Sequence, residues 1–198
     1  MSAKDFTKHA RELSGYVTNH QYELGPEGVY FPAAKAMVFG EYTHNVNGED
    51  ERTDRNLLTL EGIACLLETS LAGAQAKAGW FLAVYSGNYT PTSAVTAAQF
   101  SSSASEIVSP TEGYSESVRP QWRPDAASAG TIENVANKAV FSIVSATSVS
   151  IVGAALLSEQ IKGATTGVLM SISRFSVARE QFAGDTFNLG YRVRLQAA

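Results

Sequence analysis

The feature that most constrains the fold is an alternating segment near the C-terminal end, residues 186–195. Its apolar side chains are Phe187, Leu189, Tyr191, Val193 and Leu195, and the residues between them are polar or small. A period of two is that of a β-strand with one buried face and one solvated face. Such strands are typical of antiparallel sheets, because parallel strands are usually covered on both faces. We therefore expect Arg192 and Arg194 to point away from the core.

Other strand-like segments precede this one at fairly even spacing. Residues 139–144, 147–155 and 167–176 combine β-branched or aromatic side chains with Gly, Ser and Thr at the joins. Short strands at even spacing are typical of a sandwich or a barrel. We predict a mainly β protein, an antiparallel β-sandwich of jelly-roll-like type, whose body spans residues 36–198.

The first part of that body is expected to start with a strand over residues 35–46. Met37, Phe39 and Tyr42 are its expected apolar anchors. The sequence NVNGEDERTDR at 45–55 is expected to be a solvated loop, with an Asn-Gly turn signal inside it. Its carboxylates lack the alternate spacing of an EF-hand loop, which disfavours a calcium site.

A near-continuous apolar run at residues 79–85 is bounded by glycines. Such a run predicts a central strand, and we expect Trp80 to be buried in it. The segment from 92 to 100 is rich in Ala, Thr and Ser and suits either a short helix or an edge segment.

One helix is expected, near residues 59–76. Thr59 is a good N-cap residue, and Gly62 is the only weak position within the helix. The apolar side chains that fall on one helical face are Leu60, Ile63, Ala64, Leu67 and Leu71. We expect this face to pack across the sheet or to plug one end of the sandwich, with Cys65 as a small buried hydrophobic residue.

Residues 1–35 have no coherent period, apart from a candidate short helix at 4–13. The alternatives are a disordered tail and an extended N-terminal arm whose aromatic side chains dock on another subunit. A disordered segment normally carries fewer aromatic residues, which favours the arm. Residues 78–105 contain no charged residue, so an exposed surface there would be prone to bind other proteins. The predicted contacts with a partner or within an oligomer are Tyr16, Tyr22, Tyr30, Phe31, Tyr89 and Phe100.

Charge is unevenly distributed along the chain. Residues 1–70 hold 6 basic and 11 acidic residues, whereas the rest hold 9 and 8. The net charge of −4 disfavours nucleic-acid binding. No apolar stretch reaches the roughly 18 residues of a membrane span, and the charged opening residues predict no secretion signal. We expect neither nucleic acid nor membrane as a partner.

The residues that most often carry catalysis are confined to the first third of the chain. His9, His20, His44 and Cys65 all lie there, so the β-rich part is expected to lack a general base and soft metal ligands. No Gly-x-Ser-x-Gly elbow or phosphate-binding loop occurs. Zinc would need about four nitrogen or sulfur ligands. We predict no catalytic residue, no metal and no cofactor, and a protein that is not an enzyme, unless the loop carboxylates of Glu106, Glu112 and Glu116 converge in space.

Aromatic and basic residues are interleaved once, at 119–124. Trp122 between Arg119 and Arg123 suits a sugar-stacking platform at one end of a sandwich. The alternative is a core tryptophan beneath a proline-stiffened loop, with the arginines in solvent or paired with Glu116. The second interpretation is favoured, and the first stays open.

Several short motifs, taken in order, carry a resemblance to a known family. They are NLLTxEG at 56–62, GWFLAVYSGNYTP at 79–91, YSE at 114–116, RPxW at 119–122, IxN at 132–134, AxFxI at 139–143, GAALLS at 153–158, GxTTGVL at 163–169, RF at 174–175 and GD at 184–185. As a set, from Phe39 to the C-terminus, they resemble small virion-associated proteins of tailed double-stranded DNA bacteriophages.

The resemblance implies a head-decoration (cement) protein, made in the host cytoplasm and located on the phage head surface. Its partners would be the major capsid protein and a second or third copy of itself. A cement protein needs a rigid scaffold, a self-contact and an arm that reaches a neighbour, and symmetry multiplies weak contacts into avidity. The alternative is a tail- or fibre-associated module that binds a host glycan through Trp122.

Overall fold

The computed structural model describes residues 22–24, 30–32 and 36–197. Two compact units can be distinguished, Met1–Met37 with Leu195–Ala198, and Val38–Arg194. In the smaller unit, β1 (Tyr22–Leu24) pairs antiparallel with β2 (Tyr30–Pro32), with Glu23 opposite Phe31. The segment expected as an extended arm therefore contains a short hairpin. Tyr16 and the candidate helix at 4–13 lie outside the described residues.

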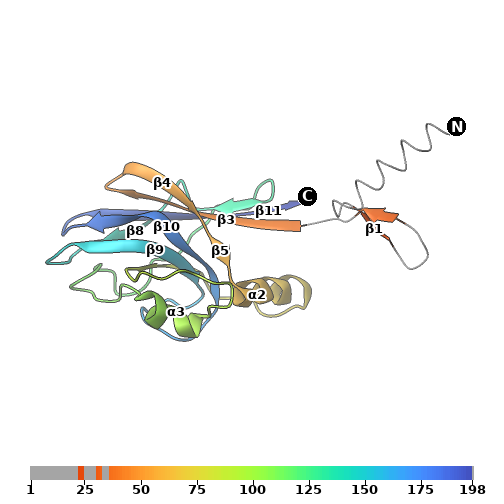
Figure 1. Ribbon diagram of the computed structural model, residues 1–198, viewed down its shortest axis with the longest axis horizontal. Coiled ribbons are helices and arrows are strands. Elements are labelled where there is room, and N and C mark those ends of the chain that lie inside the picture. The colour runs from red at the N-terminus through yellow and green to blue at the C-terminus, as the bar shows by residue number, and fades with distance from the viewer. Residues whose placement is uncertain (1–21, 25–29, 33–35, 198) are drawn as a thin grey trace. The chain divides into compact units, whose positions relative to one another are not determined.

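The larger unit is an antiparallel β-sandwich (Figure 1). One sheet has the order β4-β3-β11-β7, and β8 pairs with β11 beyond that path. The other has the order β5-β10-β9-β6. The strands of the first sheet are β3 (Ala36–Val46), β4 (Glu49–Arg55), β7 (Thr131–Glu133), β8 (Ala139–Ser142) and β11 (Thr186–Ala197). Those of the second are β5 (Leu57–Leu58), β6 (Phe81–Tyr85), β9 (Val149–Leu157) and β10 (Leu169–Gln181).

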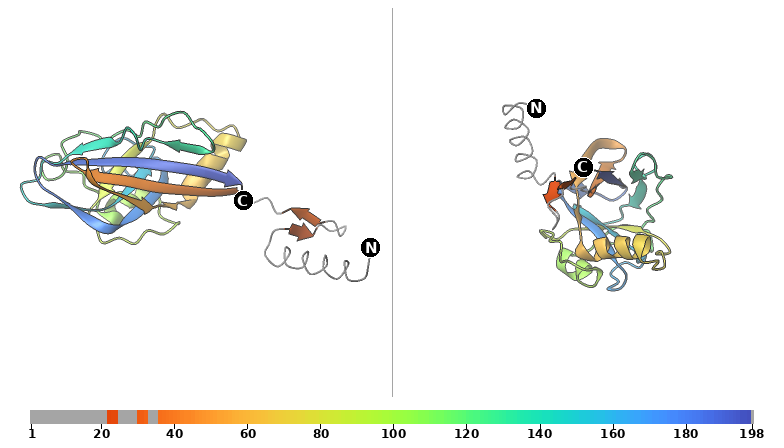
Figure 2. Two further views of the ribbon diagram at one scale, coloured as in Figure 1. Left: turned by 90° about the horizontal axis from the view of Figure 1, so that it is seen from above. Right: turned by 90° about the vertical axis from the view of Figure 1, so that its right-hand side faces the viewer.

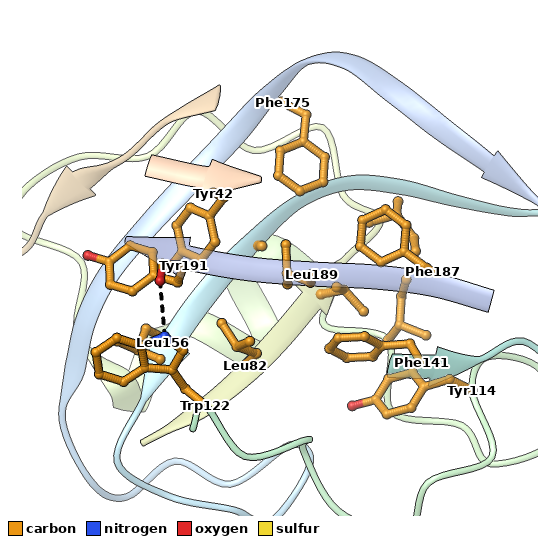
Figure 3. Close-up of a cluster of buried hydrophobic side chains, with 14 of the residues drawn as sticks. Tyr42, Leu82, Tyr114, Trp122, Phe141, Leu156, Phe175, Phe187, Leu189 and Tyr191 are labelled. Atoms are coloured by element: carbon orange, nitrogen blue, oxygen red, sulfur yellow. Dashed lines mark hydrogen bonds between the residues drawn. The ribbon is translucent and has the colours of Figure 1, made fainter. Parts of the chain in front are cut away.

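The main core lies between the two sheets and confirms the alternation of the closing strand. Phe187, Leu189 and Tyr191 of β11 are fully buried, opposite residues such as Leu82 and Leu156 of the other sheet (Figure 3). Their polar neighbours face outward as predicted. Arg192 forms ion pairs with Glu133 and Glu41, and Arg194 is exposed. Leu195, by contrast, is exposed rather than buried.

Strands β3 and β4 form a hairpin where a solvated loop was expected. Asn47 and Gly48 make the turn with φ of 51° and 82°, and such positive values suit the tight turns that match strand twist. The acidic residues that follow the turn belong to strand β4. The turn fixes the register in which β4 pairs with β3. The prediction of a loop at 45–55 is therefore wrong, although the turn itself is confirmed.

Two of the three expected anchors of β3 lie on the wrong face. Tyr42 is fully buried, but Met37 and Phe39 are 42% and 45% exposed. Alternate residues of a strand point to opposite faces, so burial of the even-numbered Tyr42 and His44 in the core places Met37 and Phe39 on the other face of β3.

Strand β6 lies at the edge of its sheet, not at the centre as predicted. A loop covers this edge, because the Leu82 N–H donates to the Pro120 carbonyl at 2.8 Å and the Ile107 N–H donates to the Val84 carbonyl at 3.0 Å. Covering an edge in this way removes a site for unwanted pairing. Trp80, expected to be buried, is half-buried against the main core.

Two helices are described. Helix α2 (Leu60–Leu71) is the one expected near 59–76, and α3 (Ala97–Ala104) bears out the short-helix alternative for the segment that starts at residue 92. Helix α3 covers the outer face of the four-stranded sheet (Figures 1 and 2). Its Phe100 lies in a second buried cluster with Tyr85 and Leu157. Within the part of the chain that the structure describes, neither helix has the length and apolar character needed to cross a membrane.

Candidate functional site

Helix α2 lies at one end of the sandwich and is held there by its small and polar side (Figures 1 and 2). The Thr59 hydroxyl caps the helix, accepting a hydrogen bond from the Gly62 N–H at 2.9 Å and donating one to the Leu169 carbonyl. The Glu61 carboxylate accepts hydrogen bonds from the backbone N–H groups of Ala97 and Leu169 at 2.9 and 2.8 Å. These contacts confirm Thr59 as the N-cap.

Gly62 brings the helix backbone against strand β10. A Cβ atom at this position would lie 2.4 Å from the Met170 carbonyl oxygen, so only glycine permits so close an approach. Gly62 and Cys65 are the buried residues of the helix. The burial of Cys65 is as predicted.

Helix α2 lies at one end of the sandwich, which is one of the two expected alternatives, but its apolar face points outward, so the expectation that this face is the packed one is wrong. We call its exposed residues the α2 stripe. They are Leu60, Ile63, Leu66, Leu67 and Leu71, which are 61%, 39%, 38%, 55% and 81% exposed. Contiguous apolar surface of this kind marks an interaction site more often than a solvated one. The α2 stripe is the first candidate functional site.

A second candidate is polar and lies near the β3–β4 turn. His44 is fully buried and stacks on Phe175 at a centroid distance of 4.0 Å. Its Nε2 is 3.0 Å from Asp54 Oδ2, and Asp54 Oδ1 accepts the Ser176 N–H at 2.7 Å. The prediction that the folded core lacks a histidine is therefore wrong, because β3 belongs to the body.

The environment of His44 and Asp54 favours a neutral imidazole beside an ionised carboxylate. Burial lowers the pKa of His44, although its bond to Asp54 acts in the opposite direction. Burial alone would raise the pKa of Asp54, but the hydrogen bonds from His44 and Ser176 outweigh it and hold that pKa below its ordinary value. Among the described residues, Nδ1 of His44 has no hydrogen-bond partner.

Next to this pair lies a cavity of about 360 Å³, lined by the β3–β4 turn and residues 177–181. Arg179 and Asp50 are both lining residues, and Arg179 Nη1 is 2.6 Å from the Asp50 carboxylate. Arg52 binds the same carboxylate at 2.9 Å, and these bonds lower the pKa of Asp50. Asp50 has a φ of 49°, a conformation that strains the backbone of a residue other than glycine. The contacts with the two arginines hold Asp50 in this conformation. His44 is not among the lining residues, so the imidazole and the cavity do not form one catalytic site.

The loop that held the alternative sugar platform is part of the interior. Arg119 is fully buried and binds Glu106 through two hydrogen bonds of 2.7 and 2.8 Å. Trp122 is buried too, and its indole N–H donates to the Tyr191 carbonyl at 3.1 Å (Figure 3). The interpretation of Trp122 as a core residue is confirmed, with Glu106 and not Glu116 as the partner of Arg119. Arg123 alone is exposed.

Two of the three loop carboxylates, Glu106 and Glu112, line one pocket of about 340 Å³, but each of the three has its own hydrogen-bond partners. Glu106 is paired with Arg119, and Glu112 accepts hydrogen bonds from Ser145 and the Ala146 N–H. Glu116 accepts the backbone N–H of Ser142. Each carboxylate therefore holds a different segment of the chain in place.

The residues predicted to contact a partner differ in how exposed they are and in how far the structure describes them. Phe100 is fully buried, so it offers no surface to a partner, and Tyr89 is half-buried against the same inner cluster. For Tyr22, Tyr30 and Phe31 the structure describes only the backbone, within the short hairpin, and Tyr16 lies outside the described residues.

Sequence reasoning missed the α2 stripe because it took the leucine face as the packed one. A signal was present in the small residues of the opposite face. Gly62, Cys65 and Thr69 recur at spacings of three and four, which is also one helical face. The sequence therefore allowed either the leucine face or the face of small residues to pack against the sandwich.

The comparisons with known proteins are negative. No protein-family model matches this chain, and no curated protein is similar to it at a significant level. Within the described ranges, no group of three or more His, Cys, Asp or Glu side chains is arranged to hold a metal ion.

Proposed function

We propose that this protein is a non-enzymatic structural component of a tailed-phage virion, acting as a capsid decoration (cement) protein. It binds the major capsid protein and associates with itself on the head surface, which stabilises the shell. The sequence motifs described above supply the setting, and the molecule supplies features that suit the role.

The observation that carries the proposal is the α2 stripe. Five large apolar side chains on one exposed helix are unfavourable in water, at about 25 cal/mol for each Å² of apolar surface. A protein that works by attachment to neighbours covers such a surface in its working state. The two-layer sandwich behind α2 provides a rigid support for that attachment.

The buried ionisable groups support the same role. Two buried pairs, Arg119 with Glu106 and His44 with Asp54, form hydrogen bonds that hold loops and strands together. The glycan-binding alternative is not supported, because Trp122, the residue expected to stack on a sugar, packs within the core.

The test is the protein's place in the particle. Purified virions are separated into heads and tails, and the copy number of the protein relative to the major capsid protein is measured by quantitative mass spectrometry. The proposal expects the protein in the head fraction, at a copy number comparable to that of the shell subunits, and expects added full-length protein to raise the disruption temperature of heads that lack it. Restriction to the tail, or absence from the particle, would contradict the proposal.

A further inference from the structure

We infer that the α2 stripe is the docking site for the N-terminal segment of a neighbouring copy, residues 6–17. The inference rests on the proposed self-association and deepens it, because it names the surface and its occupant. The argument uses the spacing of apolar residues, charge, and the length of chain before the described residues.

The α2 stripe has the form of a helix-packing surface. Leu60, Ile63, Leu67 and Leu71 follow one another at spacings of three, four and four, so they form one ridge along the helix. A partner that buries this ridge needs apolar side chains with the same period, presented over about the same length.

The segment before the described residues has that pattern. Phe6, Ala10, Leu13 and Val17 recur at spacings of four, three and four. The segment and the ridge on α2 each span eleven residue steps, so the two can pair along their whole length. The small side chain of Ala10 permits close approach of the two backbones.

Charge favours this occupant over a second copy of α2. Helix α2 has acidic residues and no basic one, and Glu68 is exposed. Pairing α2 with itself would bring two exposed Glu68 side chains to one interface, whereas the segment 6–17 supplies Lys8 and Arg11 against a single acid, Glu12. Opposite charge across an interface favours association and suppresses the like-charged alternative.

Chain length allows the contact to be made between copies. Twenty-one residues precede β1, and an extended chain advances about 3.3 Å or more per residue. The segment is therefore long enough to reach a neighbouring subunit. Each copy would offer one segment and one α2 stripe, which is a head-to-tail contact of the kind that closes into rings.

The experiment uses the full-length chain and single aspartate substitutions. Leu67→Asp places a charge on the α2 stripe, and Leu13→Asp places one on the segment. Phe182→Asp is the matched control on the body, since Phe182 is 61% exposed outside α2, and Asn19→Asp is the control in the residues that follow the segment. Circular dichroism checks that every variant is folded.

Sedimentation velocity then measures self-association. We expect Leu67→Asp and Leu13→Asp each to weaken it by roughly tenfold or more, the factor that corresponds to one buried leucine, and both controls to associate like the wild type. A mixture of the two defective variants should form a one-to-one complex, because the intact segment of Leu67→Asp can bind the intact α2 stripe of Leu13→Asp.

Three results would overturn the inference. Normal association of Leu13→Asp with loss in Leu67→Asp would assign the α2 stripe to another copy of α2. A monomeric wild-type protein would leave the stripe to a different partner. Failure of the mixture to form the one-to-one complex would contradict a contact between segment and stripe. Each result is independent of the head-binding test, so self-association through this contact can hold even if the protein is absent from phage heads.

Discussion

At the scale of single residues, the interior is organised by a few buried polar pairs. Arg119 and Glu106 lie side by side out of contact with water, and Arg119 also donates to the Glu159 carbonyl at 2.8 Å. The Gly163 N–H donates to Glu106 at 3.0 Å. One ion pair thus joins three loop segments, and its loss would leave a charge without a partner in a medium of low dielectric constant.

Arg119→Met tests this pair. We expect a loss of about 3–5 kcal/mol in the free energy of unfolding, because Glu106 is left buried and uncompensated. Urea denaturation of the variant and the wild type measures the difference. The double variant Arg119→Met with Glu106→Gln should lose less than the sum of the two single changes, and strict additivity would contradict the coupling.

His44 makes stability depend on pH. Its pKa in the folded protein is below the ordinary value of 6.5, mainly because it is buried. The unfolded chain therefore binds more protons than the folded one at acidic pH, so the contribution of His44 is complete above pH 6.5 and decreases as the pH falls below that value. Thermal unfolding measured between pH 7.5 and 5 should show this loss.

The control for that prediction is His44→Gln, which keeps a neutral donor beside Asp54. We expect its unfolding temperature to vary less over the same pH range. Asp54 does not confuse the comparison, because its pKa lies below 3.8 and it titrates at more acidic pH. An equal pH dependence in both proteins would show that other groups are responsible.

At the scale of elements, the position of α2 is decided by Gly62. Glycine is a poor helix former, about 1 kcal/mol worse than alanine, and the sequence alone marks it as a weak point. In the fold it is the residue through which α2 touches the Met170 backbone. The unfavourable propensity is offset by close packing that a larger residue would prevent.

Gly62→Ala should therefore destabilise the protein despite its better helix propensity. We expect a net loss of about 1–3 kcal/mol from overpacking against β10, measured by chemical denaturation. Ser70→Ala, on the exposed side of the same helix, is the control and should be neutral or slightly stabilising. A stabilised Gly62→Ala variant would disprove the close contact.

At the scale of the whole molecule, the body from Val38 to Arg194 is a compact unit with its own core. Its two sheets bury aromatic residues such as Tyr42, Phe141 and Phe187 between them. Among the described residues, the members of that core all lie from Tyr42 onward, so we expect the sandwich to fold without residues 1–35.

Deletion of residues 1–35 tests this separation. We expect near-ultraviolet circular dichroism and the urea unfolding midpoint of the body to change little, while self-association and head binding are lost. Both properties are measured on the same preparation. Loss of the near-ultraviolet signal would show that the first 35 residues are required for the fold.

The sequence alone predicted the features that follow from local periodicity. The buried alternation of β11, the Asn47-Gly48 turn, the Thr59 cap and the core position of Trp122 are properties of short segments. The loop at 45–55 was misjudged because its charges concealed a strand whose register is set by the preceding turn. The functional prediction from motifs in the sequence stays a proposal.

The sequence by itself determined a β-sandwich body with a capped helix, because the periods of strands and helices depend on residues close together in the chain. Tertiary structure alone decided that α2 turns its leucines outward, that β6 lies at an edge and that Arg119 pairs with Glu106. Those outcomes depend on contacts between residues far apart in the chain, such as Glu61 with Leu169 and Gly62 with Met170. The free energies of such contacts compete with each other, and no local pattern ranks them.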